Sequence, residues 1–200
     1  MIAALRTLAA RLRRDETGTA LVELAMVIPL LLLLFFGLID FGRMAFNYST
    51  TEKAVQMVAR RAVVSPGCAG VSFAPYQKVS GQAYPLGTAC RVNANACQPV
   101  ADVSCNGASF FDDVAALMPV GATADNLRIT YSYDPNLGFL GGPYTPMVTV
   151  EIANLAFDFV SPLAALVSLA GGTPTDGLGA TTAFPPISVS LPAESLGAGS

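Results

Sequence analysis

Four cysteines are the residues of this sequence with the clearest chemical meaning. Cys68, Cys90, Cys97 and Cys105 lie within one stretch of 38 residues, and the sequence contains no histidine. A zinc site would therefore need all four thiolates, yet the spacings of 21, 6 and 7 residues lack the close cysteine pairs of structural zinc sites. Two disulfides fit better if the chain is exported. The first-choice pairing is Cys68 with Cys90 and Cys97 with Cys105, and the two other connectivities stay open.

Catalytic side chains are the second kind of chemistry to look for. Without histidine there is no Ser-His or Cys-His pair, and no carboxylate pair lies in a recognisable acid-base motif. Lys53 and Lys78 lack the S-x-x-K context of serine-lysine catalysis. We therefore predict that the protein is not an enzyme and holds neither a metal nor a cofactor.

Composition and charge place the chain among membrane-associated proteins. Only 12% of the 200 residues are charged and 52% are hydrophobic, which is too apolar for an ordinary cytosolic enzyme unless one segment concentrates the apolar residues. Past Met44, six basic residues face ten acidic ones. Such a mildly acidic domain repels phosphate backbones, so nucleic acid is not an expected partner.

A membrane-spanning helix is predicted near the N-terminus. Residues 19–39 contain a single charge, Glu23, among twenty-one positions, and as a helix they span about 30 Å, the thickness of the bilayer hydrocarbon. The run is too long for a cleaved secretory signal and lacks an A-x-A-like end. Four arginines precede it within the first fourteen residues, which predicts a cytoplasmic N-terminus and an exported remainder.

The helix is expected to continue beyond the membrane. Between residues 44 and 65, one helical face carries the apolar or small side chains and the other carries polar ones, and Pro66 then ends the helix. The expected inner face consists of Met44, Tyr48, Thr51, Val55, Val58 and Ala62.

The exported part, residues 66–200, is predicted to be a small disulfide-containing α+β domain with a disordered C-terminal tail. Residues 68–107 read as a loop region and residues 110–118 as a short helix. Alternating apolar and polar positions predict strands at residues 127–133, 147–152 and 187–191. The expected fold is a long transmembrane-plus-amphipathic helix packed on a small antiparallel sheet. Residues 155–170 are too short and carry Asp158, which disfavours a second span.

Two motifs lie at the ends of the apolar run, DETGTALVELA at residues 15–25 and Asp40-Phe41-Gly42-Arg43. Together they resemble the TadE-like family (TadE/TadG pseudopilins) of the tight-adherence (Tad/Flp) pilus, which implies a pilin-like fold. DETGTALVELA at residues 15–25 is similar to the family's G-x-x-x-V-E-[FL]-A block, although Leu24 stands where phenylalanine is frequent. Asp40, Phe41, Gly42 and Arg43 match its [DE]-[FY]-G-R membrane-exit motif. The match covers residues 11–65, and the distal half resembles the family only in layout.

The resemblance implies a precursor that a membrane prepilin peptidase trims. Cleavage after Gly18 would remove a basic leader, residues 1–18, make Thr19 the first mature residue and leave residues 19–43 as the transmembrane helix. Glu23 would then be the fifth mature residue and an assembly carboxylate, because an ionised side chain at bilayer depth usually marks a partner or a function. Other implied partners are pilins or pseudopilins, the inner-membrane pilus platform and membrane lipid.

The predicted function is that of a minor pilin, pseudopilin or assembly component of a tight-adherence type IV pilus. The protein would cross the inner membrane once, with its C-terminal domain exported and possible association with the pilus. The alternative is a membrane-tethered adhesin or ligand-binding module, whose helix would be a plain anchor that keeps its leader.

Overall fold

The computed structural model describes residues 17–68, 73–92, 96–159, 171, 181–193 and 196. The predicted leader up to residue 16, residues 160–170 of the apolar stretch and most of the predicted tail lie outside the described residues. The chain divides into two compact units, with a boundary inside the long helix after Arg43. Of the described residues, the first unit contains 17–43, Phe159 and Gly171, and the second contains the others.

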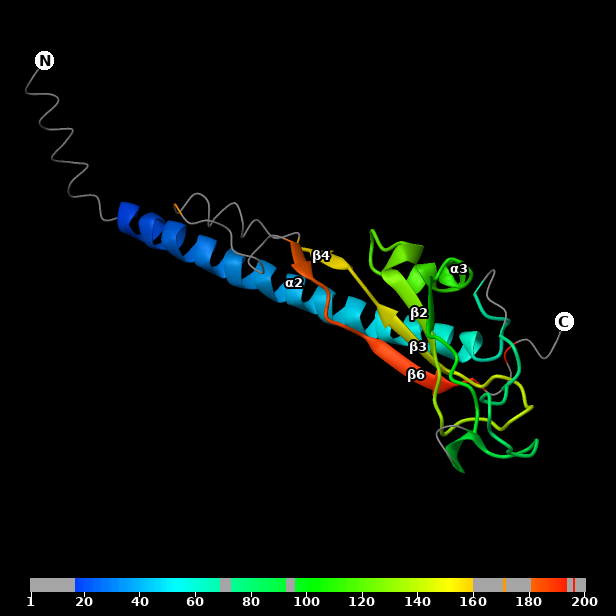
Figure 1. Ribbon diagram of the computed structural model, residues 1–200. Coiled ribbons are helices and arrows are strands. Elements are labelled where there is room, and N and C mark those ends of the chain that lie inside the picture. Colours follow the sequence, from blue (N-terminus) through cyan, green and yellow to red (C-terminus); the bar gives the residue numbers. More distant parts are fainter. Residues whose placement is uncertain are drawn as a thin grey trace, which may run out of the picture. The chain divides into compact units, whose positions relative to one another are not determined.

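One helix, α2 (Thr17–Ala62), accounts for the N-terminal part of the described chain (Figure 1). Its side chains are exposed from Gly18 to Phe36, in keeping with a run that is apolar on every side. Its C-terminal part is amphipathic: Lys53 and Arg60 are exposed, whereas one face is buried. That face consists of Thr51, Ala54, Val55, Val58, Ala59 and Ala62.

The predicted inner face of this helix is confirmed for four of its six residues. Thr51, Val55, Val58 and Ala62 are buried, whereas Met44 is half-buried and Tyr48 is 37% exposed. Tyr48 instead stacks on Phe184, with ring centroids 6.3 Å apart. The regular helix ends at Ala62, shortly before the predicted stop at Pro66.

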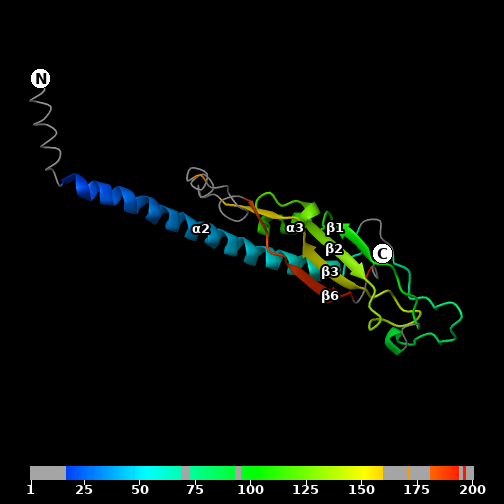
Figure 2. The same ribbon diagram turned by 60° about the vertical axis from the view of Figure 1, so that its left-hand side comes forward.

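The second unit contains a four-stranded antiparallel sheet in the order β1-β2-β3-β6 (Figures 1 and 2). A separate ribbon is formed by two short antiparallel strands, β4 and β5. The bounds are Val103–Asn106 (β1), Leu127–Ser132 (β2), Met147–Ile152 (β3), Ala156–Asp158 (β4), Thr181–Ala183 (β5) and Ser188–Pro192 (β6).

The core of this unit lies between the sheet and the C-terminal part of α2, which runs along one sheet face in both views (Figures 1 and 2). The side chains that β2 and β3 turn to this face are buried completely or nearly so: Leu127, Ile129, Tyr131, Val148, Val150 and Ile152. Arg61 near the end of α2 forms an ion pair with Asp113. The predicted α+β fold, a long apolar N-terminal helix with a small antiparallel sheet, is confirmed.

Some short elements differ from the sequence expectation. The predicted strands correspond to β2, β3 and β6, but β1 falls inside the expected loop region, and β4 and β5 were not predicted. The predicted helix at 110–118 is split into α3 (Phe111–Val114) and a 3-10 turn, η2 (Ala115–Leu117). Two further 3-10 turns are η1 (Cys90–Val92) and η3 (Ala124–Asn126). Elements of three or four residues are too short to show a periodicity in the sequence.

Candidate functional site

The predicted processing and assembly residues lie in the first two turns of α2. Gly18, Thr19 and Glu23 are all exposed, and a methyl group added to Gly18 would meet no atom within 4 Å. Glycine destabilises a helix by about 1 kcal/mol relative to alanine, so this first turn is easily opened. Gly18 therefore lies exposed in a turn that unwinds at little cost.

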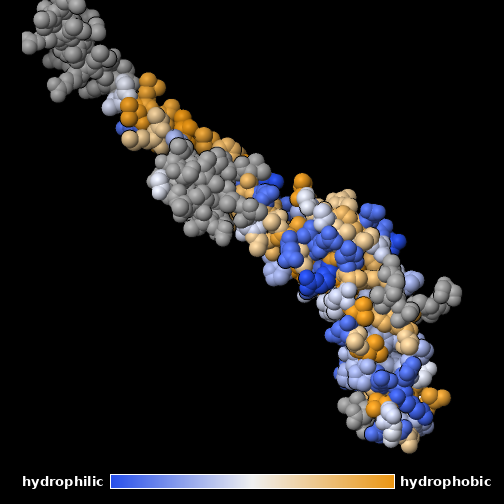
Figure 3. All heavy atoms as spheres, turned by 45° about the horizontal axis from the view of Figure 1, so that its top comes forward, coloured by the Kyte–Doolittle hydropathy of each residue, from blue (hydrophilic) through white to orange (hydrophobic). Residues whose placement is uncertain are grey.

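An apolar surface surrounds the helix after these residues. Met26, Leu30 and Leu34 are 75%, 70% and 67% exposed, and Figure 3 shows hydrophobic atoms along the N-terminal part of α2. Exposure of one such side chain to water costs about 1.5 to 3 kcal/mol of free energy relative to an apolar environment. By length and composition, α2 is able to cross a membrane, and lipid or another apolar helix would cover this surface.

The predicted exit motif contains an ion pair. The Asp40 side chain is only 3% exposed, and its Oδ1 lies 3.4 Å from Nη1 of Arg43, one helical turn later. A buried carboxylate needs such a partner, because desolvation of an unpaired charge costs several kcal/mol. Phe41 is largely exposed and has an edge contact with Phe159, whereas Gly42 has open space around it. The structure therefore brings Asp40 and Arg43 together where the apolar run ends.

The four cysteines form two disulfides, Cys68 with Cys105 and Cys90 with Cys97. The first-choice pairing from the sequence is therefore wrong. Cys68 follows the end of α2 and Cys105 lies on β1, so this bond joins two elements that the sequence alone does not place side by side. The other bond closes one short loop around η1.

Aromatic side chains surround the second disulfide. Tyr76, Leu140 and Tyr144 are buried with Cys90 and Cys97 in one cluster. The Tyr76 hydroxyl donates to the carbonyl oxygen of Thr145 at 3.0 Å, which holds the loop between β2 and β3 against the segment that contains Tyr76. The partly buried residues packed on the cluster are Phe73, Tyr84, Val100 and Tyr133. Sequence reasoning missed this cluster, although aromatic residues recur in the segment that it read as a loop.

Two tyrosine hydroxyls in this region are buried without a hydrogen-bond partner among the described residues: those of Tyr133 and Tyr144. The pKa of Tyr144 is raised to about 12, mainly by burial and to a smaller extent by the nearby Tyr76 and Asp102. Burial likewise raises the pKa of Tyr133, with smaller contributions from Tyr76 and Asp134. Both hydroxyls are therefore neutral at physiological pH.

A hollow of about 400 Å³ lies between residues 73–77 and the segment that leads into β1. Phe73, Pro75, Pro99, Val100 and Val103 give it a mainly apolar lining. The main-chain N–H of Gln98 donates to the carbonyl of Gln77 at 2.8 Å and joins the two segments. No pattern in the sequence predicts this hollow, because its walls come from irregular segments brought together by the fold.

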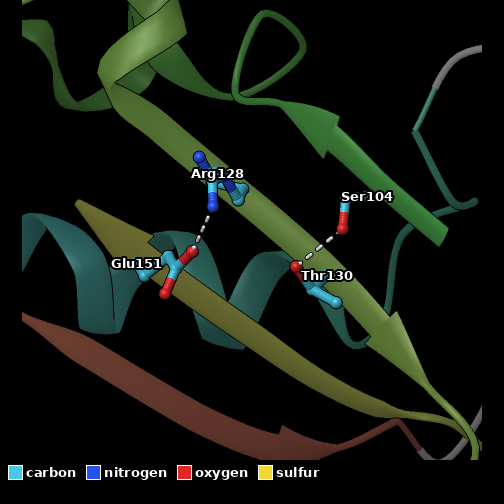
Figure 4. A network of polar contacts seen from close by, with 4 residues as sticks. All are labelled: Ser104, Arg128, Thr130 and Glu151. Atoms are coloured by element: carbon cyan, nitrogen blue, oxygen red, sulfur yellow. Dashed lines mark hydrogen bonds and ion pairs between the residues drawn. The ribbon is translucent and has the colours of Figure 1, made fainter. Parts of the chain in front are cut away.

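Polar side chains cover the sheet face opposite α2 (Figure 4). Ser104, Thr130, Thr149 and Ser190 are cross-strand neighbours in one row, and their hydroxyls interact in pairs: Ser104 with Thr130 at 3.0 Å and Thr149 with Ser190 at 2.8 Å. In the next row, Arg128 Nη1 lies 3.2 Å from Glu151 Oε1. This face is solvated, and exposed pairs of this kind therefore contribute about 1 kcal/mol or less.

Removal of the two disulfides is expected to have unequal effects. Cys68 and Cys105 are 37 positions apart and Cys90 and Cys97 are 7 apart. Loop-closure entropy then predicts that the Cys68→Ala/Cys105→Ala variant loses about 4 kcal/mol of unfolding free energy and the Cys90→Ala/Cys97→Ala variant about 2.5 kcal/mol. Denaturant unfolding of both variants measures this, with non-reducing peptide mapping of the wild type as control. A peptide containing Cys68 linked to Cys90 would contradict the pairing.

Tyr144→Phe is expected to change the pH dependence of stability. Unfolded tyrosine ionises near pH 10, whereas the pKa of Tyr144 in the fold is raised to about 12. The folded state therefore holds this proton more tightly, and its stability falls as the pH rises above about 10. The variant should show a shallower fall and unchanged or slightly higher stability at neutral pH, since an unpartnered hydroxyl is lost. Denaturant unfolding of the variant and the wild type between neutral and alkaline pH tests this, and an equally steep fall in both proteins would contradict it.

Comparison with known proteins gives one family. Residues 18–60 match the family model described as TadE-like protein, and the matched segment lies within α2. Neither the curated proteins nor the solved structures give a match. Over these residues the chain is similar to TadE-like proteins, and the resemblance predicted from its two motifs is confirmed for this segment.

Proposed function

We propose that the protein is a minor pilin, a pseudopilin or an assembly component of a tight-adherence type IV pilus. The TadE-like match over residues 18–60 carries the proposal, because it associates the chain with Tad pili and coincides with the apolar helix α2. The family is structural rather than catalytic, which agrees with a chain whose sequence contains no histidine and no recognisable catalytic motif.

The protein is anchored in the cytoplasmic membrane by residues 19–43, and residues 44–65 continue the helix into the exported domain, residues 66–200. The exposed apolar side chains of the first part of α2 and the unit boundary at Arg43 support this division. The basic residues before Thr19 favour a cytoplasmic N-terminus. The two disulfides support export, because disulfides persist in oxidising compartments.

Glu23 acts in assembly rather than in anchoring. It lies about one turn inside the apolar run, where an ionised carboxylate is costly unless it is paired. Cleavage after Gly18 would create a positively charged amine on Thr19, four residues before Glu23 in the helix. Pairing with that amine, in the same subunit or in a neighbouring pilin, would offset the desolvation of both charges and fix the register of the helix.

Processing after Gly18 is the first expected outcome. Protein purified from membranes of cells that contain a prepilin peptidase should begin at Thr19, because Gly18 is exposed at the border of the polar leader and the apolar run. Intact mass and N-terminal sequencing measure this, with cells that lack the peptidase as control. A stable chain that still begins at Met1 in peptidase-containing cells would favour the plain anchor of an adhesin.

Substitution of Glu23 should separate insertion from assembly. Glu23→Ala is expected to leave membrane insertion and cleavage nearly unchanged but to reduce incorporation into the pilus or its base. Glu23→Gln should be similarly defective, because the amide keeps hydrogen bonding but loses the charge. A piliation assay beside a cleavage immunoblot measures both steps, with the conservative Glu52→Gln on the exposed part of α2 as control. Normal assembly by the Glu23→Ala protein would show that the carboxylate has no such role.

A further inference from the structure

The two outer strands of the sheet, β1 and β6, have different free edges. Among the described strands, β1 pairs with β2 alone and β6 with β3 alone, so each strand turns one row of main-chain groups away from the sheet. Such a row is able to pair with another extended chain, and folded proteins usually obstruct it. Which residues form each row follows from the register.

In β6 the free edge is obstructed by proline. Ile152 donates to the Ile187 carbonyl at 3.0 Å and Ala193 donates to the Pro146 carbonyl at 2.9 Å, so the odd-numbered residues of β6 face β3. The free row therefore consists of Ser188, Ser190 and Pro192. Pro192 has no N–H, and Pro185 and Pro186 precede the strand. This edge offers little room for an added strand.

In β1 the free edge contains no proline. Ala153 donates to the Asn126 carbonyl at 2.8 Å, so the even-numbered residues of β2 face β3 and the odd-numbered ones face β1. In β1 the main-chain groups of Val103 and Cys105 then pair with β2, and those of Ser104 and Asn106 point away from the sheet. Both of these residues are exposed.

The chain before β1 leaves the sheet at Asp102, because the side chain of this residue takes the place of a main-chain carbonyl in the hydrogen-bond ladder. The Asp102 carboxylate accepts the main-chain N–H of Tyr133 at 3.2 Å, in the place where a continued β1 would supply its own carbonyl. The segment leading into β1 is therefore free to form one wall of the 400 Å³ apolar hollow. Phe73 on the other wall contacts Tyr131, a residue of the buried sheet face, with ring centroids 5.2 Å apart.

A second, more polar hollow of about 240 Å³ lies at the other end of β1. It is lined by Ser104, Asn106 and Arg128 of the solvated sheet face, together with Asp125. The Asn106 side chain donates to Asp125 at 3.0 Å, which places this carboxylate beside the end of the strand. The free edge of β1 thus has an apolar hollow near its start and a second hollow near its end, which Cys105 and Leu127 also line. The carboxylates of Asp102 and Asp125 lie near these two ends, and Arg128 of the second hollow is paired with Glu151.

We propose that the free edge of β1 binds an extended segment of another polypeptide, which adds to the sheet as a further antiparallel or parallel strand. Its residues would alternate between apolar and polar, because successive side chains of a strand point to opposite faces. Basic residues would flank it, because the edge ends in two carboxylates. This interaction surface goes beyond the proposed pilus function and does not depend on it.

A second copy of β1 does not fit this edge well. Two antiparallel β1 strands would offer each other only the main-chain groups of Ser104 and Asn106. They would also bring the aspartates of both copies close together, and like charges across an interface disfavour binding. A different partner with basic ends avoids this repulsion.

The test uses the full-length protein in detergent micelles and a labelled peptide of alternating threonine and valine with a lysine at each end. Saturable binding is expected by fluorescence anisotropy, with slower hydrogen exchange of the Ser104 and Asn106 amides in the complex. The matched control peptide has the same side chains but alternate N-methylated amides, and it should bind about tenfold more weakly or worse, because it cannot form the ladder. Equal binding of both peptides would overturn the proposal.

Two proline variants test the edge itself. Ser104→Pro removes one outward N–H of β1, and Ser190→Pro removes the corresponding N–H of β6 at the other end of the same cross-strand row. Ser104→Pro should weaken peptide binding about tenfold or more and Ser190→Pro less than about twofold, because one main-chain hydrogen bond and the fit of the added strand are lost only at β1.

Equal losses in the two variants would overturn the proposal, as would binding without protection of the Ser104 amide in the wild type. The protection measurement remains decisive if Ser104→Pro fails to fold. Concentration-dependent dimerisation that protects the same amides without peptide would assign the edge to a second copy and would also overturn the proposal. None of these outcomes bears on processing or piliation, so failure here is distinguishable from failure of the pilus assignment.

Discussion

Burial of one face of α2 against the sheet is the interaction on which the second unit depends. Val55 and Val58 of the helix and Ile129 and Val150 of the sheet are buried completely or nearly so. Full burial of such side chains contributes about 1.5 to 3 kcal/mol each, more than any exposed ion pair in the unit. Alanines at positions 54, 59 and 62 are also buried. The short strands gain most of their stability from this contact.

The two parts of α2 are suited to different environments. Its first part exposes apolar side chains on every side, which is stable only in lipid or among other apolar helices. Its last part has a buried stripe and a charged surface, which is stable in water. The paired Asp40 and Arg43 lie where the pattern changes. An uninterrupted helix is suited to both environments because its backbone hydrogen bonds are satisfied internally in each of them.

The two disulfides stabilise the part of this unit that lies beyond the contact between α2 and the sheet. Residues 68–107 contain few regular elements, and β1 is only four residues long. A strand of this length gains little from its own ladder. The Cys68–Cys105 bond holds it beside the end of α2, and the Cys90–Cys97 bond holds the loop on which the aromatic cluster is built. The distal part of this unit therefore depends on an oxidising environment that keeps both disulfides formed.

How far the sequence predicts this structure depends on how local each feature is. The apolar run, the amphipathic stripe and the strands β2, β3 and β6 have periodic patterns within single segments, so they could be recognised. Strand β1 could not, because V-S-C-N is too short to show a pattern. The first-choice disulfide pairing was wrong because no segment of the sequence shows that the fold brings Cys105 to the end of α2. The hollow beside β1 depends on two separate segments, and neither segment shows it alone.

The two edges of the sheet limit pairing of their exposed main-chain groups in different ways, proline at β6 and carboxylates at β1. Proline at the β6 edge removes a hydrogen-bond donor, so that edge is poor for every partner regardless of charge. Carboxylates near both ends of β1 leave the main-chain donors and acceptors in place and disfavour only partners of the same charge. A mildly acidic domain with this arrangement resists pairing with itself while it remains open to a basic strand. Strand β1 keeps its outward hydrogen-bonding groups and also lies beside the apolar hollow. The same edge is therefore suited to bind the main chain of a partner strand and to select the partner by its side chains.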